Sequence, residues 1–127
     1  MKRIIYLVMM LFLFPAICGA SEVWKVTAYC SCKKCCGPKS NNTTASGRRC
    51  KTGYVALNWL PFGTKILVNG IQMVVMDRGA ESLFGTYYHK LKKKKHPKYI
   101  KHIDIWMQSH EDALRFGCKY LPVEIIK

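Results

Sequence analysis

The chain has few acidic residues: its 127 residues include 21 Lys and Arg but only seven Asp and Glu, for a formal net charge of +14. Because acids are so scarce, a carboxylate embedded in an apolar run is informative. Asp77 follows the apolar run Met73–Met76, and Asp104 lies between two isoleucines. A buried carboxyl group needs a polar partner, and its pKa is usually raised. These two aspartates are therefore candidates for general acid chemistry.

The chain also lacks an internal repeat and an apolar run long enough to span a membrane comfortably. Two basic residues precede an apolar stretch from Ile4 to Ile17, and small residues end at Ala20. This pattern predicts a secretory signal peptide over residues 1–20; an uncleaved anchor and a lipoprotein cleaved before Cys18 are the alternatives. Residues 21–127 then form one small domain, which we expect to be a secreted or periplasmic, cell-wall-associated monomer without a stable membrane anchor.

Cysteines are frequent for a domain of this size. Six remain after the signal peptide, namely Cys30, Cys32, Cys35, Cys36, Cys50 and Cys118. An even number in a small exported domain predicts disulfides, although the sequence does not select a pairing. The spacing of the first four is also compatible with metal ligation by thiolates. No histidine lies near this cluster in the sequence, so we favour disulfides and expect no metal and no cofactor.

Strand-forming runs alternate with turn signals along the domain. The Asn69-Gly70 dipeptide between two such runs predicts a β-hairpin, and Ser109 is expected to cap a short helix that ends before Gly117. These features predict a mainly β fold, a small β-barrel with one short helix near the C-terminus. We expect strands at Val23–Tyr29, Gly53–Leu57, Thr64–Val68, Ile71–Asp77, Ile103–Met107 and Tyr120–Ile126.

Several short motifs follow one another in order. They are Val26-Thr27-Ala28-Tyr29-Cys30, Cys35-Cys36-Gly37, Thr44-Ala45-Ser46-Gly47, Leu60-Pro61-Phe62-Gly63-Thr64-Lys65, Met76-Asp77-Arg78-Gly79 and His102-Ile103-Asp104-Ile105. The ordered set resembles the 3D domain, a family named for three aspartates. This family is related to the catalytic barrel of membrane-bound lytic transglycosylase A and to stationary-phase survival proteins. The resemblance extends over almost all of residues 21–127.

The resemblance implies a double-psi β-barrel that cleaves peptidoglycan between N-acetylmuramic acid (MurNAc) and N-acetylglucosamine (GlcNAc), leaving 1,6-anhydro-MurNAc ends. In such a lytic transglycosylase, Asp104 would act as acid and then as base, and Asp77 would support it in the same groove. Candidates for substrate contacts are Tyr29, Thr44, Asn58, Lys65, Gly79 and His102.

Two features depart from the family pattern. Asn58 stands where the first aspartate is expected, and its amide cannot titrate. The 26 residues between Asp77 and Asp104 form a longer connection than in the family, with a lysine-rich insertion at about 86–101. Both departures favour an alternative, a non-catalytic peptidoglycan-binding module on the same barrel. A second alternative is a two-carboxylate glycoside hydrolase in which Asp77 is the general base. Either aspartate could instead have a structural role.

The positive charge, about +12 without the signal peptide, predicts adhesion to polyanions. We expect peptidoglycan glycan strands and anionic cell-wall polymers as partners. The lysine-rich insertion is interpreted as an electrostatic clamp on such polymers or as a solvated loop. A cationic effector that acts by charge alone is a further alternative. No recognised nucleic-acid motif accompanies the lysines, so we expect no nucleic-acid partner.

Overall fold

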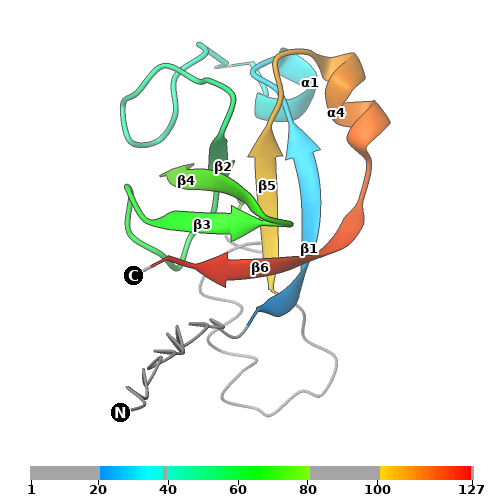
Figure 1. Cartoon of the computed structure of the whole chain (residues 1–127). Coiled ribbons are helices and arrows are strands. Elements are labelled where there is room, and N and C mark those ends of the chain that lie inside the picture. The colour runs from blue at the N-terminus through cyan, green and yellow to red at the C-terminus, as the bar shows by residue number, and fades with distance from the viewer. Residues whose placement is uncertain (1–20, 39, 81–100, 127) are drawn as a thin grey trace, which may run out of the picture.

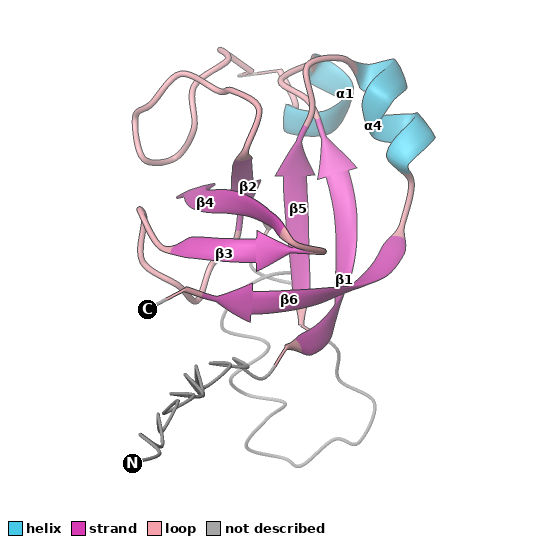
Figure 2. Cartoon of the chain, in the orientation of Figure 1, coloured by secondary structure: helices cyan, strands magenta, loops and turns pink. Residues whose placement is uncertain are grey.

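A computed structural model describes residues 21–38, 40–80 and 101–126. In these residues the fold is mainly β, with six strands closed into one barrel and two short helices (Figures 1 and 2). The mainly β class and the barrel predicted from the sequence are confirmed. The elements are β1 (Glu22–Tyr29), α1 (Lys33–Cys36), β2 (Tyr54–Ala56), β3 (Lys65–Val68), β4 (Ile71–Asp77), β5 (His102–Trp106), α4 (His110–Phe116) and β6 (Lys119–Ile125).

The order of strands around the barrel is β1-β5-β2-β4-β3-β6, which differs from their order in the sequence. Two neighbouring pairs, β1 with β5 and β2 with β4, are parallel, and the other four pairs are antiparallel. The parallel pairing of β1 with β5 sets Thr27 beside Asp104. This crossed connectivity brings residues that are far apart in the sequence onto adjacent strands.

Alternate residues of the strands fill the barrel interior. Trp24 and Val26 of β1, and Ile103 and Ile105 of β5, are buried, with two-residue spacing on each strand. Each fully buried aliphatic side chain contributes about 1.5–3 kcal/mol relative to its exposed state. The cluster continues with Val55, Leu57, Ile66, Val68, Val75 and Val123. Asp104 lies between the two buried isoleucines and therefore points away from this interior.

The β3–β4 hairpin turns at Asn69 and Gly70, which have positive φ angles of 49° and 80°. A two-residue turn of this kind requires positive φ at both central positions, and this requirement explains the Asn-Gly pair. The hairpin predicted from this dipeptide is confirmed, and it fixes the register in which β4 delivers Asp77 to the barrel end.

Both helices lie at the barrel end where β1 and β5 terminate (Figure 1). Ser109 precedes α4, and its Oγ accepts a hydrogen bond from the Asp112 amide at 3.0 Å. The helix α1 was not expected from the sequence. Among the residues that the structure describes, no helix is long enough and apolar enough to cross a bilayer. The predicted signal peptide and all of the lysine-rich insertion except Lys101 fall outside the described residues.

Candidate functional site

A groove of about 440 Å³ opens at the end of the barrel that carries α1. One wall is formed by the last residues of β1, β2 and β4 and by Asp104 in the middle of β5, and the other by α1 and the loop between α1 and β2. Asp77 and Asp104 both line it, so the two aspartates singled out from the sequence share one groove. The lining residues are Tyr29, Ser31, Cys35, Cys36, Ser40, Asn41, Asn42, Thr43, Cys50, Ala56, Asp77, Arg78, Gly79, Ala80 and Asp104.

The two aspartates stand on either side of β2. Ala56 pairs with Asp77 on β4 and with Asp104 on β5. Because neighbouring strands lie about 4.8 Å apart, the backbones of the aspartates are separated by roughly 10 Å. Ala56 lines the groove between them, and its methyl group leaves the space above β2 open. The strand order therefore creates a gap that two carboxylates can face.

Asp104 is the candidate proton donor in the groove. Burial raises the pKa of its carboxyl group to about 6, and the negative charge of Asp77 adds to this rise, although the hydrogen bond from Thr27 lowers it. Thr27 Oγ1 donates to Asp104 Oδ1 at 3.0 Å. A carboxyl group with a pKa near 6 holds its proton in a substantial fraction of molecules at mildly acidic pH and can donate it.

Thr27 connects Asp104 to His102. The hydroxyl oxygen of Thr27 lies 2.7 Å from His102 Nε2. Because the single hydroxyl proton is directed to Asp104, we assign Nε2–H as the donor to Thr27. Burial, with a smaller effect of Lys25, lowers the pKa of His102 to about 4, so the ring is neutral at neutral pH. His102 is thus connected to the groove through Thr27 and is not among the residues that line it.

Asp77 is held by three hydrogen-bond donors. Tyr29 Oη donates to its Oδ2 at 2.5 Å, and the backbone amides of Ala45 and Arg78 donate to its Oδ1, each at 2.8 Å. In all three bonds an Asp77 carboxyl oxygen is the acceptor. Burial and the bond to Asp77 raise the pKa of Tyr29, so the phenol remains a donor. These contacts fix the orientation of Asp77 in the groove.

Asn58 and Gly79 form a reciprocal pair. The Asn58 side chain donates to the Gly79 carbonyl at 2.9 Å and accepts from the Gly79 amide at 2.8 Å. Gly79 lines the groove, whereas Asn58 is not among the lining residues and reaches the groove only through its bonds to Gly79. An aspartate could accept from the amide but could not donate to the carbonyl. The residue in place of the expected first aspartate therefore has a structural role that requires an amide.

Besides Asn58 and His102, two further expected substrate contacts do not line the groove. Thr44 is buried within the loop between α1 and β2, where its hydroxyl contacts Ser46 Oγ at 2.8 Å and the Arg48 carbonyl at 3.0 Å. Its neighbour Thr43 lines the groove instead. Lys65 is an exposed residue at the start of β3 and does not line the groove.

Sequence reasoning did not single out Thr27 or Ala56 for the site. Thr27 had only its place in a family motif as a signal, and Ala56 had none. Both become significant through strand pairing, because Thr27 lies opposite Asp104 and Ala56 lies between the two aspartates.

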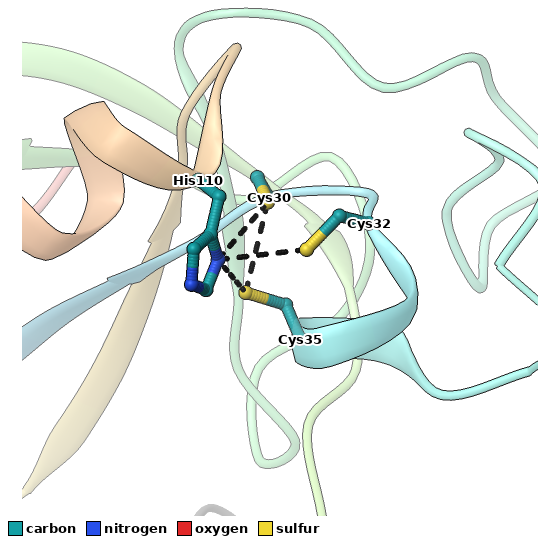
Figure 3. A group of neighbouring side chains, drawn as sticks. All are labelled: Cys30, Cys32, Cys35 and His110. Carbon is teal, nitrogen blue, oxygen red and sulfur yellow. Dashed lines mark hydrogen bonds between the residues drawn. The ribbon is translucent and has the colours of Figure 1, made fainter.

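The cysteines divide between the groove and a second cluster. Cys36 and Cys50 line the groove together with Cys35. Cys30, Cys32 and Cys35 also gather around His110, a residue that is distant from them in the sequence (Figure 3). All six cysteines from Cys30 to Cys118 are free thiols in the structure. The expected disulfides therefore stay a prediction.

Comparison with known proteins gives no assignment. No family model matches the chain, and no curated protein matches it. The resemblance to the 3D domain therefore depends on the ordered motifs alone, and the function must be argued from the groove.

Proposed function

We propose that the protein is an exported peptidoglycan-cleaving enzyme of the lytic transglycosylase type. The observation that carries the proposal is the shared groove, in which the pKa of Asp104 is raised to about 6 beside the tightly held Asp77. We also propose that the barrel is of the double-psi type. Two parallel pairs, β1–β5 and β2–β4, within an otherwise antiparallel closed barrel support this assignment.

In the proposed reaction Asp104 acts twice. Its protonated carboxyl group first donates a proton to the glycosidic oxygen between MurNAc and GlcNAc, and the bond from that oxygen to C1 of MurNAc breaks. The resulting carboxylate then takes the proton of the MurNAc 6-hydroxyl as this oxygen bonds to C1. Asp104 is thereby reprotonated, no water is consumed, and the products are a GlcNAc end and a 1,6-anhydro-MurNAc end.

Asp77 contributes through its charge. Its carboxylate raises the pKa of Asp104, which favours the acid form before the first step. Positive charge develops at C1 as the glycosidic bond breaks, and a fixed negative charge in the same groove stabilises it. Tyr29 and the two backbone amides hold Asp77 in place for this role without removing it from the groove.

The surroundings of the groove suit an anionic glycan. Five exposed cations lie on α1 and the loop that forms the second wall, namely Lys33, Lys34, Arg48, Arg49 and Lys51. Stem peptides and attached wall polymers carry carboxylates and phosphates, which such cations attract. This distribution supports peptidoglycan and anionic wall polymers as the partners.

A two-carboxylate hydrolase is the second candidate, and one observation favours it. A whole strand separates Asp77 from Asp104, and inverting glycosidases place their carboxyl groups about 6.5–9.5 Å apart to admit a water molecule. In that reaction Asp77 would activate the water, and the products would have reducing ends. A non-catalytic binding module would use the same groove and release no product.

The products of a peptidoglycan digest test the proposal. Purified sacculi are incubated with the protein, and the released fragments are identified by mass spectrometry. We expect anhydro-muropeptides from the parent protein and from Glu124→Gln, a control on β6 outside the groove, and none from Asp104→Asn. Fragments with reducing ends would indicate the hydrolase, and wall binding without release would contradict both enzyme proposals.

A further inference from the structure

A second cluster of reactive side chains lies beside the groove and has no part in the chemistry proposed above. Cys30 follows the end of β1, Cys32 and Cys35 belong to the α1 segment, and His110 is the first residue of α4. Figure 3 shows the three sulfur atoms and the imidazole converging on one point. All four ligand atoms lie within 4.8 Å of one another. The fold thus brings two chain segments, residues 30–35 and the start of α4, to one small volume.

Four of the six distances between these atoms match the edges of a tetrahedron around zinc, and all six are within 4.8 Å. With Zn–S bonds of about 2.3 Å and Zn–N bonds of about 2.0–2.1 Å, a regular tetrahedron has S–S edges of about 3.8 Å and S–N edges of about 3.6 Å. The sulfurs of Cys30 and Cys35 are 3.6 Å apart. His110 Nδ1 lies 3.8, 3.5 and 3.4 Å from the sulfurs of Cys30, Cys32 and Cys35.

We propose that Cys30, Cys32, Cys35 and His110 bind one structural zinc ion. Thiolate sulfur with imidazole nitrogen in tetrahedral geometry is the ligand set that zinc prefers. All four positions are filled by protein atoms, so no coordination position is open for a reacting water or substrate. The site is therefore structural rather than catalytic.

The immediate surroundings also suit a thiolate site. The backbone N–H groups of Cys35 and Cys36 donate to the Cys32 carbonyl at 3.1 and 2.9 Å, which fixes the turn that carries Cys32 and Cys35. The exposed side chains of Lys33 and Lys34 lie on α1 and offset the net negative charge of three thiolates with one zinc ion. Cys36 is directed differently, because its thiol donates to the Cys30 carbonyl at 3.2 Å.

The ion would connect the rim of the groove to the barrel. Cys35 lines the groove, while Cys30 and His110 belong to segments anchored on β1 and α4. Zinc would therefore fix α1 and the start of the loop that forms the second wall. This proposal does not depend on the proposed function, since a binding module would need the same rim.

The zinc content of single-residue variants tests the site. The full protein is purified with reductant, loaded with zinc, freed of excess metal and analysed by native mass spectrometry and elemental analysis. We expect one zinc per chain in the parent and in Cys36→Ser and Cys118→Ser. Cys35→Ser and His110→Ala should weaken zinc binding by more than about 100-fold, since loss of an outer-shell partner already costs about 10–100-fold.

Cobalt(II) provides a readout that needs no variant. Bound to the parent protein, it should give sulfur-to-metal charge-transfer bands and intense visible bands of a tetrahedral site with three thiolates. Absence of zinc from the reduced, zinc-loaded parent would overturn the proposal. So would a Cys35→Ser protein that retains zinc at full affinity, or peptide mapping that finds a Cys30–Cys35 disulfide in protein purified with zinc present.

Discussion

The carboxylate groove and the cysteine–histidine cluster are neighbours, but the fold constructs them differently. Asp77 and Asp104 stand on barrel strands, and protein donors already satisfy them, three at Asp77 and Thr27 at Asp104. The four residues of the cluster stand on loop and helix termini and face mainly one another. The two carboxylates are therefore held largely by groups of the barrel strands, whereas the cluster needs an ion to hold its segments together.

The largest expected effect is the loss of peptidoglycan cleavage on substitution of Asp104. Asp104→Asn removes the proposed acid and base, and general acid–base catalysis contributes roughly 10²–10⁴-fold. The release of soluble fragments from peptidoglycan should fall by at least that factor, while zinc content stays at one per chain. Retention of more than a tenth of the parent rate would contradict the role of Asp104, and a loss of zinc would show that the two regions are not independent.

Removal of the metal should lower thermal stability, in contrast to Asp104→Asn, which should lower the cleavage rate and leave the zinc content unchanged. Chelation leaves the barrel core and the Asp104–Thr27 contact in place but releases α1 from α4. We expect the thermal midpoint to fall by more than the roughly 4–8 °C that corresponds to 1 kcal/mol in a domain of this size. The same fall should occur in Asp104→Asn, as measured by circular dichroism with and without chelator. An unchanged midpoint in the zinc-loaded parent would show that the ion does not stabilise the fold.

The difference in pH dependence between the parent and Asp104→Asn isolates Asp104, because His102, whose pKa is lowered to about 4, contributes in the opposite direction in both proteins. The pKa of Asp104 is raised in the folded state to about 6, so the native protein binds its proton more tightly than the unfolded chain does. The free energy of unfolding therefore falls as pH rises from about 4 to 6 through this group, by about 1–3 kcal/mol in total.

Asp104→Asn should remove this dependence. The variant should unfold at a higher temperature than the parent at pH 7, and the difference should disappear near pH 4. Thermal melts across this pH range provide the measurement. Parallel pH profiles for the two proteins would contradict a raised pKa at Asp104.

Tyr29→Phe tests how firmly Asp77 is held. The substitution keeps the ring but removes the hydroxyl that donates to Asp77 Oδ2. Hydrogen bonds to charged groups contribute about 1.5–3 kcal/mol, and the two backbone amides still hold the other oxygen. We expect a loss of about 1–2 kcal/mol in denaturant unfolding together with a reduced cleavage rate. A variant that unfolds like the parent would show that the amides alone position Asp77.

The smallest expected effect is a small loss of stability on substitution of Asn58. Asn58→Asp restores the acidic residue that the family pattern leads one to expect, but it loses the donor to the Gly79 carbonyl. A carboxylate oxygen facing that carbonyl should cost about 1 kcal/mol of stability. Denaturant unfolding measures the change. A variant that is as stable as the parent and cleaves faster would show instead that the position has a catalytic use.

Much of the barrel could be predicted from local sequence. The Asn69-Gly70 turn and the alternating apolar runs carry their own signals, because turn geometry and two-residue periodicity are local properties. The partnership of Thr27 with Asp104 could not be predicted, since it depends on the register of a parallel pair that no nearby turn fixes. His110 was missed for the same reason. It reaches the cysteines because α1 and α4 lie at one end of the barrel, and no spacing in the sequence records this.

The source of the oxygen at the newly formed ends tests the central claim most directly. Peptidoglycan is digested by the protein in water enriched in heavy oxygen, and the masses of the released fragments are measured. The account predicts 1,6-anhydro ends without heavy oxygen, because Asp104 transfers the MurNAc 6-hydroxyl proton and no water enters. Reducing ends that carry heavy oxygen would contradict it.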